Sequence, residues 1–182
     1  MKVIAICGSP RKGNTEQMLQ WVLDSCRAGG AEVEMVLLKD LKIQHCTGCD
    51  MCYGAGRPCV IDDDMESVIS KMLEADAIVF GSPNYFFNVS GMMKDFIDRT
   101  NCICDPYLLK GKVSACVAVG ARDVNETCLV ESVFKKYIGV MGMVCVGSVI
   151  GKAEDPGEIT KNEDVKLACT ELGNRILDKL RH

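Results

Sequence analysis

The sequence opens with KVIAICGSPRKGNT, residues 2–15, in which an apolar run passes directly into a polar, glycine-bearing loop. The run at 2–7 is continuously apolar, which is typical of a β-strand that is buried on both faces. Beyond the loop, apolar residues recur on one face of a helix: Met18, Leu19, Val22, Leu23 and Cys26. The stretch therefore predicts a strand, a tight loop and a helix in direct succession.

The loop GSPRKGNT, residues 8–15, has the composition of a phosphate site. Gly8 and Gly13 allow sharp turns that gather backbone amides where a helix N-terminus already favours an anion. Further donors and positive charge come from Ser9, Arg11, Lys12, Asn14 and Thr15. The spacing is neither GxxxxGK[ST] nor GxGxxG, so we expect one terminal phosphate rather than a nucleoside triphosphate or a dinucleotide. The alternative is a simple turn in which Asn14 or Thr15 caps the helix.

Four further apolar runs follow the first, at residues 32–38, 77–81, 113–120 and 143–151. Helical patterns separate or follow these runs, which predicts an α/β fold with a doubly wound, five-stranded parallel sheet and helices on both faces. In the flavodoxin-type strand order 2-1-3-4-5, the first and third strands are neighbours, and ligands bind at the carboxyl edge beside them. The length of 182 residues favours one domain over 1–182, with a cysteine-rich excursion at 45–60.

Two more polar loops are expected at the same edge. The third strand runs into GSPNYFFNVSG, residues 81–91, and the fourth ends in GARDVNET, residues 120–127. Together with the phosphate loop they suit a flat cofactor that bears a phosphate, namely FMN, with its ring against residues 83–86. The residues that we nominate in these two loops are Pro83, Asn84, Tyr85, Phe86, Gly120, Ala121 and Arg122. Alternatively, the aromatic pair is a hydrophobic anchor, and Asn88 or Ser90 is only a helix cap.

The stretch HCTGCDMCYGAGRPC, residues 45–59, contains four of the twelve cysteines in a C-x2-C-x2-C-x6-C pattern: Cys46, Cys49, Cys52 and Cys59. Iron–sulfur clusters are held by four thiolates, and the close spacing of the first three lets them wrap one face of a cluster. The spacing favours an iron–sulfur cluster, and Gly48, Gly54 and Gly56 permit the tight turns. The alternatives are a structural zinc site, for which the spacing is cramped, and free or redox-active thiols without metal.

Two connections are long for such a fold, at 40–63 and 151–160. The first contains the cysteines, and the second shows no pattern from which a role follows. The acidic run Asp62-Asp63-Asp64 precedes the second helix, where we expect it to cap the helix and complement its dipole rather than bind a metal. We expect His45 to face solvent or to support the neighbouring cysteines rather than to be a ligand.

GSPRKGNT, the cysteine run, CVIDDDM (59–65) and EADAIVFGSPNYFFNVSGMMKDFIDRT (74–100) together resemble the NADPH-dependent FMN reductase superfamily. More narrowly, they are similar to the iron–sulfur flavoproteins of anaerobic archaea and bacteria, over residues 1 to about 151. The resemblance implies a flavodoxin-like fold that binds FMN, with a [4Fe–4S] cluster on the four cysteines. It also implies that subunits associate as a homodimer or a dimer of dimers, with one subunit's cluster near a neighbouring subunit's FMN.

Composition argues against several other classes of protein. The net charge of −4 argues against a nucleic-acid surface, and no window approaches 18 continuous apolar residues, so we expect no membrane span. The opening run leaves no room for a signal peptide, so we expect a reducing cytoplasm in which the thiols stay free. The only imidazoles are those of His45 and His182, so the chemistry is expected to belong to a cofactor.

These observations predict an FMN-dependent oxidoreductase that transfers electrons between a donor, such as ferredoxin or NAD(P)H, and an acceptor. The first alternative is a cluster-free NAD(P)H-dependent FMN or quinone reductase. The second is a non-enzymatic electron carrier of the flavodoxin type. The third is a thiol- or metal-binding protein that uses the fold only as a scaffold.

Overall fold

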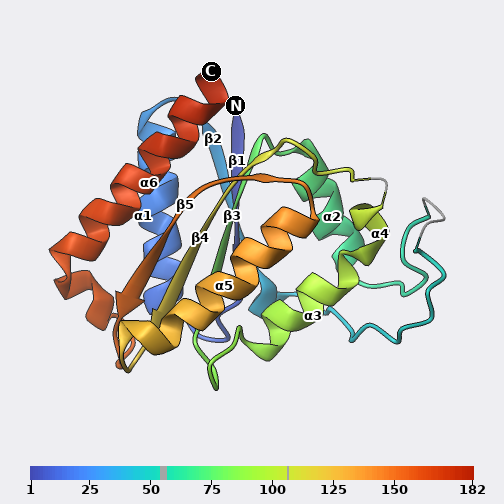
Figure 1. Cartoon of the computed structure of the whole chain (residues 1–182), viewed down its shortest axis with the longest axis horizontal. Helices are drawn as coiled ribbons and strands as arrows, with labels where there is room; N and C mark the ends of the chain where they lie inside the picture. Colours follow the sequence, from blue (N-terminus) through green and yellow to red (C-terminus); the bar gives the residue numbers. More distant parts are fainter. Residues whose placement is uncertain (54–56, 106) are drawn as a thin grey trace.

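The five predicted strands form one parallel sheet in a computed structural model, which describes residues 1–53, 57–105 and 107–182. The strands are β1 (Lys2–Cys7), β2 (Glu32–Leu37), β3 (Ala77–Pro83), β4 (Val113–Gly120) and β5 (Val144–Lys152). Their order in the sheet is β2-β1-β3-β4-β5 (Figure 1). This order confirms the predicted flavodoxin-like, doubly wound α/β fold.

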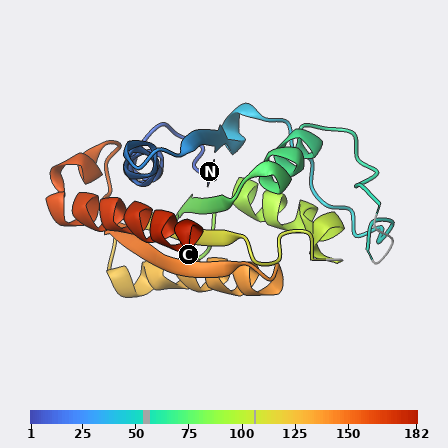
Figure 2. The same cartoon turned by 90° about the horizontal axis from the view of Figure 1, so that it is seen from above.

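Helices cover both faces of the sheet, as Figures 1 and 2 show from two directions. One face is covered by α1 (Asn14–Ala28), η2 (Glu158–Lys161) and α6 (Glu163–Arg181). The other is covered by α2 (Met65–Glu74), α3 (Gly91–Arg99), α4 (Asn101–Cys104) and α5 (Val124–Val140), while a short η1 (Leu38–Asp40) follows β2. Among the helices of the described residues, none is both long and apolar enough to cross a membrane.

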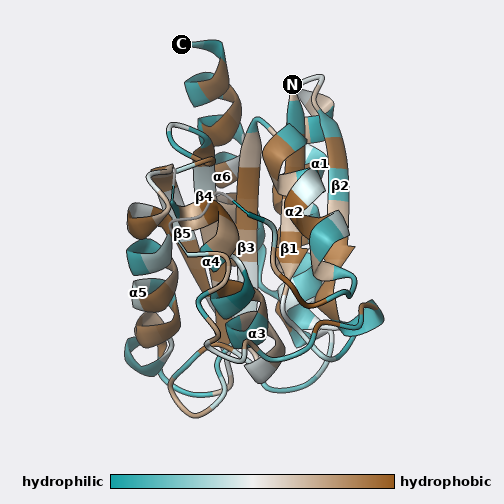
Figure 3. Cartoon of the chain, turned by 90° about the vertical axis from the view of Figure 1, so that its right-hand side faces the viewer, coloured by the Kyte–Doolittle hydropathy of each residue, from teal (hydrophilic) through white to brown (hydrophobic). Residues whose placement is uncertain are grey.

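Burial on both faces explains why the strands are continuously apolar. In β1, Ile4 and Ile6 pack into the core on the α2, α3 and α5 side, whereas Val3 and Ala5 pack into the core on the α1 and α6 side. Successive side chains of a strand point to opposite faces, so each face of β1 supplies part of a separate core. Figure 3 shows β1 and β3 as largely hydrophobic strands between the helical layers.

The ends of β1 and β3 are tied together at the carboxyl edge. The N–H of Gly8 donates to the carbonyl of Gly81 over 2.8 Å, and the Ser90 hydroxyl donates to the carbonyl of Gly8. A Cβ at Gly8 would lie 2.7 Å from the Cβ of Met93, so only glycine lets the first loop pass this close to α3. Ser90 is also the N-cap of α3, which confirms the expectation that Ser90 could cap a helix. The two polar loops are therefore fixed side by side.

The connection between η1 and α2, residues 41–64, is hereafter the cysteine loop. Figures 1 and 2 both show its described residues, 41–53 and 57–64, extending away from the sheet at one side of the molecule. Gly48 and Asp50 have left-handed backbone angles, with φ of 64° and 55°. Gly48 therefore supplies one of the predicted turns. Gly54 and Gly56, for which turns were also predicted, lie outside the described residues.

Candidate functional site

A cavity at the carboxyl edge of the sheet is lined by most of the residues that the sequence nominated for FMN. Those residues are Ser9, Arg11, Gly13, Asn14, Thr15, Pro83, Asn84, Tyr85, Gly120 and Ala121. The remaining two, Phe86 and Arg122, line an adjoining cavity that shares Asn84 and Ala121 with the first. The topology therefore brings the three predicted loops together, and their role in binding FMN stays a prediction.

The phosphate loop leaves the first turn of α1 open. Its N-cap is Gly13, and no side chain in the described residues caps the helix, so the alternative interpretation with Asn14 or Thr15 as the cap is wrong. Amide N–H groups at an uncapped N-terminus need an acceptor, and a phosphate supplies one. The Ser9 hydroxyl donates to the carbonyl of Arg11 over 2.8 Å, so this side chain shapes the turn.

The connection after β5 forms a further wall of the same cavity, which the sequence did not reveal. Ala153, Glu154 and Pro156 line the cavity. The Asn14 amide donates to the carbonyl of Asp155 over 2.9 Å and accepts from the N–H of Ile159 over 3.2 Å. Asn14 therefore holds this wall against the phosphate loop instead of offering its amide to a ligand. The sequence did contain one indication of this wall: the connection follows the fifth strand, whose carboxyl end lies at the same edge of the sheet.

The carboxylate of Glu158 fixes the backbone of this connection after β5. Glu158 accepts hydrogen bonds from the backbone N–H groups of Glu154 and Asp155, over 2.7 and 3.0 Å. These backbone bonds lower the pKa of Glu158. The segment that faces the phosphate loop is thus fixed by its own short-range contacts.

The turn after β3 presents two aromatic side chains in a strained backbone. Tyr85 and Asn88 exchange backbone hydrogen bonds, and the two residues between them, Phe86 and Phe87, have φ of 49° and 64°. Left-handed angles at bulky residues are unfavourable by about 1–3 kcal/mol each and are typical of functional sites. Phe86 is 97% exposed, so the interpretation of this residue as a hydrophobic anchor is wrong. Phe86 and Phe87 instead line the adjoining cavity, together with Arg122 and Glu126.

A buried ion pair fixes the base of the cysteine loop. The Arg99 guanidinium at the end of α3 donates to both carboxylate oxygens of Asp63, over 2.7 and 2.9 Å, and the two side chains are 1% and 4% exposed. Burial alone would raise the pKa of Asp63, but hydrogen bonds from Arg99 and from the backbone N–H groups of Gln44 and Met65 outweigh it and lower the pKa. A bidentate, charge-assisted pair of this kind has a defined geometry, so it holds the loop in place.

The predicted role of the acidic run is partly wrong. The N-cap residue of α2, Asp64, makes no side-chain cap and accepts instead from the N–H of Lys42 over 2.7 Å. Asp63 does accept from the N–H of Met65, but its main partner is Arg99. The run therefore joins the two stems of the cysteine loop. His45 pairs with Asp95 of α3 at 2.6 Å, which raises the pKa of His45 and attaches the loop to that helix.

The four predicted ligands all lie on the cysteine loop. Cys46 and Cys49 are exposed, and Cys52 and Cys59 are partly buried. Burial raises the pKa of Cys52, and charge interactions with Cys59 and Cys46 raise it further. The donor set fits a [4Fe–4S] cluster, since such clusters are held by four thiolates. In the described conformation, no three groups of the residues that the structure covers are arranged as metal ligands.

The sequence as a whole places the protein in a family. A model of the NADPH-dependent FMN reductase family matches residues 1–155, which include all three polar loops and the cysteine loop. The chain belongs to this family. An iron–sulfur flavoprotein of Methanocaldococcus jannaschii is 34% identical, in a match that covers 100% of this chain and 98% of that protein. An iron–sulfur flavoprotein of Archaeoglobus fulgidus is 38% identical, with 98% of this chain and 80% of that protein covered.

A solved structure agrees with the fold. A flavodoxin from the domain Archaea has a TM-score of 0.66 and 19% identity, and the match covers 100% of both chains. Membership of the FMN reductase family confirms the predicted resemblance, and it supports FMN as the cofactor and FMN-dependent oxidoreductase activity. The cavity beside the open N-terminus of α1 has the chemistry that the phosphate of FMN requires.

Proposed function

We propose that this FMN reductase family member is an iron–sulfur flavoprotein. FMN would lie at the carboxyl edge, with its phosphate on residues 9–15 and its ring against 83–86. A [4Fe–4S] cluster would be held by the thiolates of Cys46, Cys49, Cys52 and Cys59. Electrons would pass between a donor, such as ferredoxin or NAD(P)H, and an acceptor. The cytoplasmic location rests on the thiol-rich composition, because reducing compartments keep cysteines free.

One observation carries the proposal. Four thiols with cluster spacing lie on a loop whose base is fixed by a buried ion pair, while the thiols themselves remain accessible. Burying an ion pair is energetically costly, because the desolvation of both charges must be offset. The names of two relatives as iron–sulfur flavoproteins support the same assignment.

The chain's own residues would bind and orient the cofactors. When bound, FMN supplies two-electron and one-electron transfer, and a cluster supplies single-electron transfer. Arg11 and the open amides of α1 would bind the phosphate anion. The Tyr85–Asn88 turn offers aromatic faces at the adjoining cavity, which Ala121 and Arg122 after β4 also line.

Cluster and flavin binding should be separable by mutation. Cys59→Ala removes one of the four proposed thiolates and leaves the sheet and the phosphate loop unchanged, so protein made without oxygen should lose most of its iron and sulfide and retain FMN. The matched control is Cys128→Ala, which removes a partly buried thiol from α5, outside the cysteine loop. Iron, acid-labile sulfide and FMN are measured per chain. Full iron and sulfide in Cys59→Ala would show that Cys59 is not a ligand.

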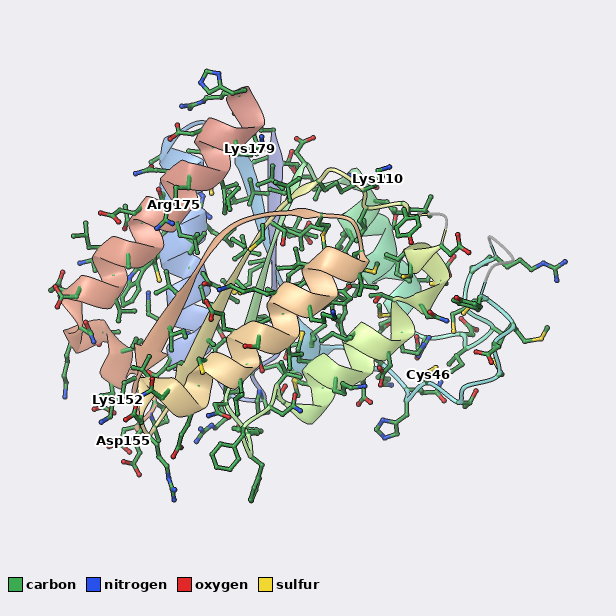
Figure 4. All side chains as sticks on the ribbon, viewed as in Figure 1. Cys46, Lys110, Lys152, Asp155, Arg175 and Lys179 are labelled. Carbon is green, nitrogen blue, oxygen red and sulfur yellow. The ribbon has the colours of Figure 1, made fainter. Side chains whose placement is uncertain are left out.

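We also infer that the protein forms a homodimer or a dimer of dimers. Figure 4 shows Cys46 at one side of the molecule and Asp155, at the carboxyl edge, at the opposite side. The cysteine loop and the turn after β3 both carry exposed apolar side chains, among them Met51, Tyr53 and Phe86. Association through these surfaces would bury them and bring one subunit's cysteines to a neighbour's flavin cavity.

The assembly is tested by light scattering at micromolar concentration. We expect a dimer or tetramer, and Phe86→Ser with Phe87→Ser should weaken it, because the two exposed rings are removed. The control is Leu167→Ser, which alters an exposed apolar residue on α6. A monomeric wild-type protein would rule out this intermolecular arrangement.

A cluster-free NAD(P)H-dependent FMN reductase is the second candidate. It is favoured by one observation, which is that the described thiols are not gathered as metal ligands. Rapid NADPH oxidation by purified protein that contains FMN but no iron would establish it in place of the first proposal.

A further inference from the structure

The wall at residues 153–156 closes one end of the cavity that contains the phosphate loop. Pro156 lies over Gly13, the residue before the first turn of α1, so that a Cβ at Gly13 would be 3.9 Å from both the Cα and the Cβ of Pro156. Gly13 and Pro156 also line a second, polar groove along α1, together with Lys12, Glu16, Gln17, Gln20 and Gly157. The approach of Pro156 to Gly13 therefore separates the phosphate cavity from this groove.

Hydrogen bonds hold the wall in place at both of its ends. At its start, the N–H of Ala153 donates to the carbonyl of Gly120, at the end of β4, over 3.0 Å. At its other end, the Asn14 amide bonds to the backbone of Asp155 and of Ile159, and Ile159 is fully buried. The wall is thus tied to β4 and to α1, and a ligand that needs more room at this end must break these contacts.

The room behind the wall suits a terminal phosphate. FMN ends in a phosphate monoester, whereas FAD continues from the same phosphate through a second phosphate to adenosine. The phosphate cavity has a volume of about 140 Å³, and sites that enclose a whole small molecule have volumes of about 300–1,000 Å³. The cavity therefore has no room for the nucleotide half of FAD. Glu154 also lines it, so a second phosphate would face a carboxylate.

We propose that the wall makes this site specific for a flavin that ends in a single phosphate, so that the protein binds FMN and excludes FAD, and that Asn14 is the positioning residue that keeps the wall closed. The inference rests on the proposed function, because it requires the phosphate of FMN on residues 9–15. FAD binds only when the wall leaves α1, and that movement breaks both hydrogen bonds of Asn14. FMN binds without this movement, so the cost falls on FAD alone.

The first test is Asn14→Ala, which removes both hydrogen bonds and leaves Arg11 and the open amides of α1 in place. Dissociation constants of FMN, FAD and riboflavin are measured by isothermal titration calorimetry with the full-length apoprotein. The ratio of the FAD constant to the FMN constant should fall by about 10- to 100-fold in the variant, because two hydrogen bonds no longer oppose the opening of the wall. Riboflavin should bind both proteins alike, because the wall encloses only the phosphate.

The matched control is Asn174→Ala. Asn174 of α6 also joins α1 to a distant segment, since it accepts a hydrogen bond from the hydroxyl of Ser25 over 3.0 Å, but it does so near the opposite end of α1. The ratio of the two dissociation constants should stay at the wild-type value in this control.

Glu158→Ala is the second variant. It removes the carboxylate that holds the backbone N–H groups of Glu154 and Asp155, so it should lower the same ratio, and it carries the test if Asn14→Ala does not fold. An unchanged ratio in both variants, or wild-type protein that binds FAD as tightly as FMN, would overturn the inference and leave the proposed function intact. Wild-type protein that binds riboflavin as tightly as FMN would overturn the proposed phosphate site and the inference together.

Discussion

Replacing Asp63 by alanine is expected to lower the free energy of unfolding by about 3–5 kcal/mol, because the substitution leaves the buried Arg99 guanidinium without its counterion. The backbone N–H groups of Gln44 and Met65 lose their acceptor at the same time. Unfolding in urea, followed by circular dichroism, measures the loss. A decrease below about 1 kcal/mol would show that the pair does not hold the loop, since that is the range of exposed ion pairs.

The matched control is Asp98→Ala, which breaks the Lys94–Asp98 pair on α3, where the side chains are 55% and 42% exposed. We expect a change of at most about 1 kcal/mol there. Combining Asp63→Ala with Arg99→Met should restore part of the stability, because no uncompensated charge then remains buried.

The Asp63–Arg99 pair also predicts that the stability of the protein depends on pH. The pKa of Asp63 is lowered from its ordinary value of 3.8, so its contribution to stability is present above that pH and is lost as the pH falls through the lowered pKa. The difference between the wild type and Asp63→Ala should therefore shrink in that acidic range.

FMN affinity should fall by about 100- to 10,000-fold when Arg11→Gln and Thr15→Val are combined. Both residues line the cavity at the carboxyl edge, and each hydrogen bond to a charged phosphate is worth about 1.5–3 kcal/mol. Quenching of flavin fluorescence on titration into apoprotein measures the dissociation constant. Riboflavin, which lacks the phosphate, should bind the variant and the wild type alike, so the two ligands separate a phosphate effect from misfolding.

A charge-matched control for this prediction lies on the same helix. Arg27→Gln removes a positive charge at the C-terminal end of α1, away from the phosphate loop, and should leave FMN affinity unchanged. If the double variant bound FMN as tightly as the wild type, the phosphate would have to lie elsewhere.

The sheet could be predicted from the sequence because its signal is local. Continuous apolar runs identified all five strands, and the polar loops that follow three of them had to meet at one edge once the strand order was known. Ser90 was recognised as a cap candidate because capping depends on residues within one turn.

The contacts that fix the site could not be predicted because they join distant residues. Arg99 lies in the helical pattern MMKDFIDRT, and nothing near it in the sequence shows that it is buried against Asp63. The wall at residues 153–156 depends on Asn14, more than a hundred residues away. The strain at Phe86 and Phe87 also escaped prediction, because these residue types disfavour a left-handed backbone and only the surrounding fold imposes it.

The composition of wild-type protein prepared without oxygen tests the central claim most directly. Iron, acid-labile sulfide and FMN are measured per chain, together with the electron paramagnetic resonance spectrum after reduction by dithionite. We predict about four iron atoms, about four sulfides and about one FMN per chain, with the spectrum of a reduced [4Fe–4S] cluster. Protein that contains FMN but neither iron nor sulfide, even after anaerobic reconstitution with both, would contradict the account.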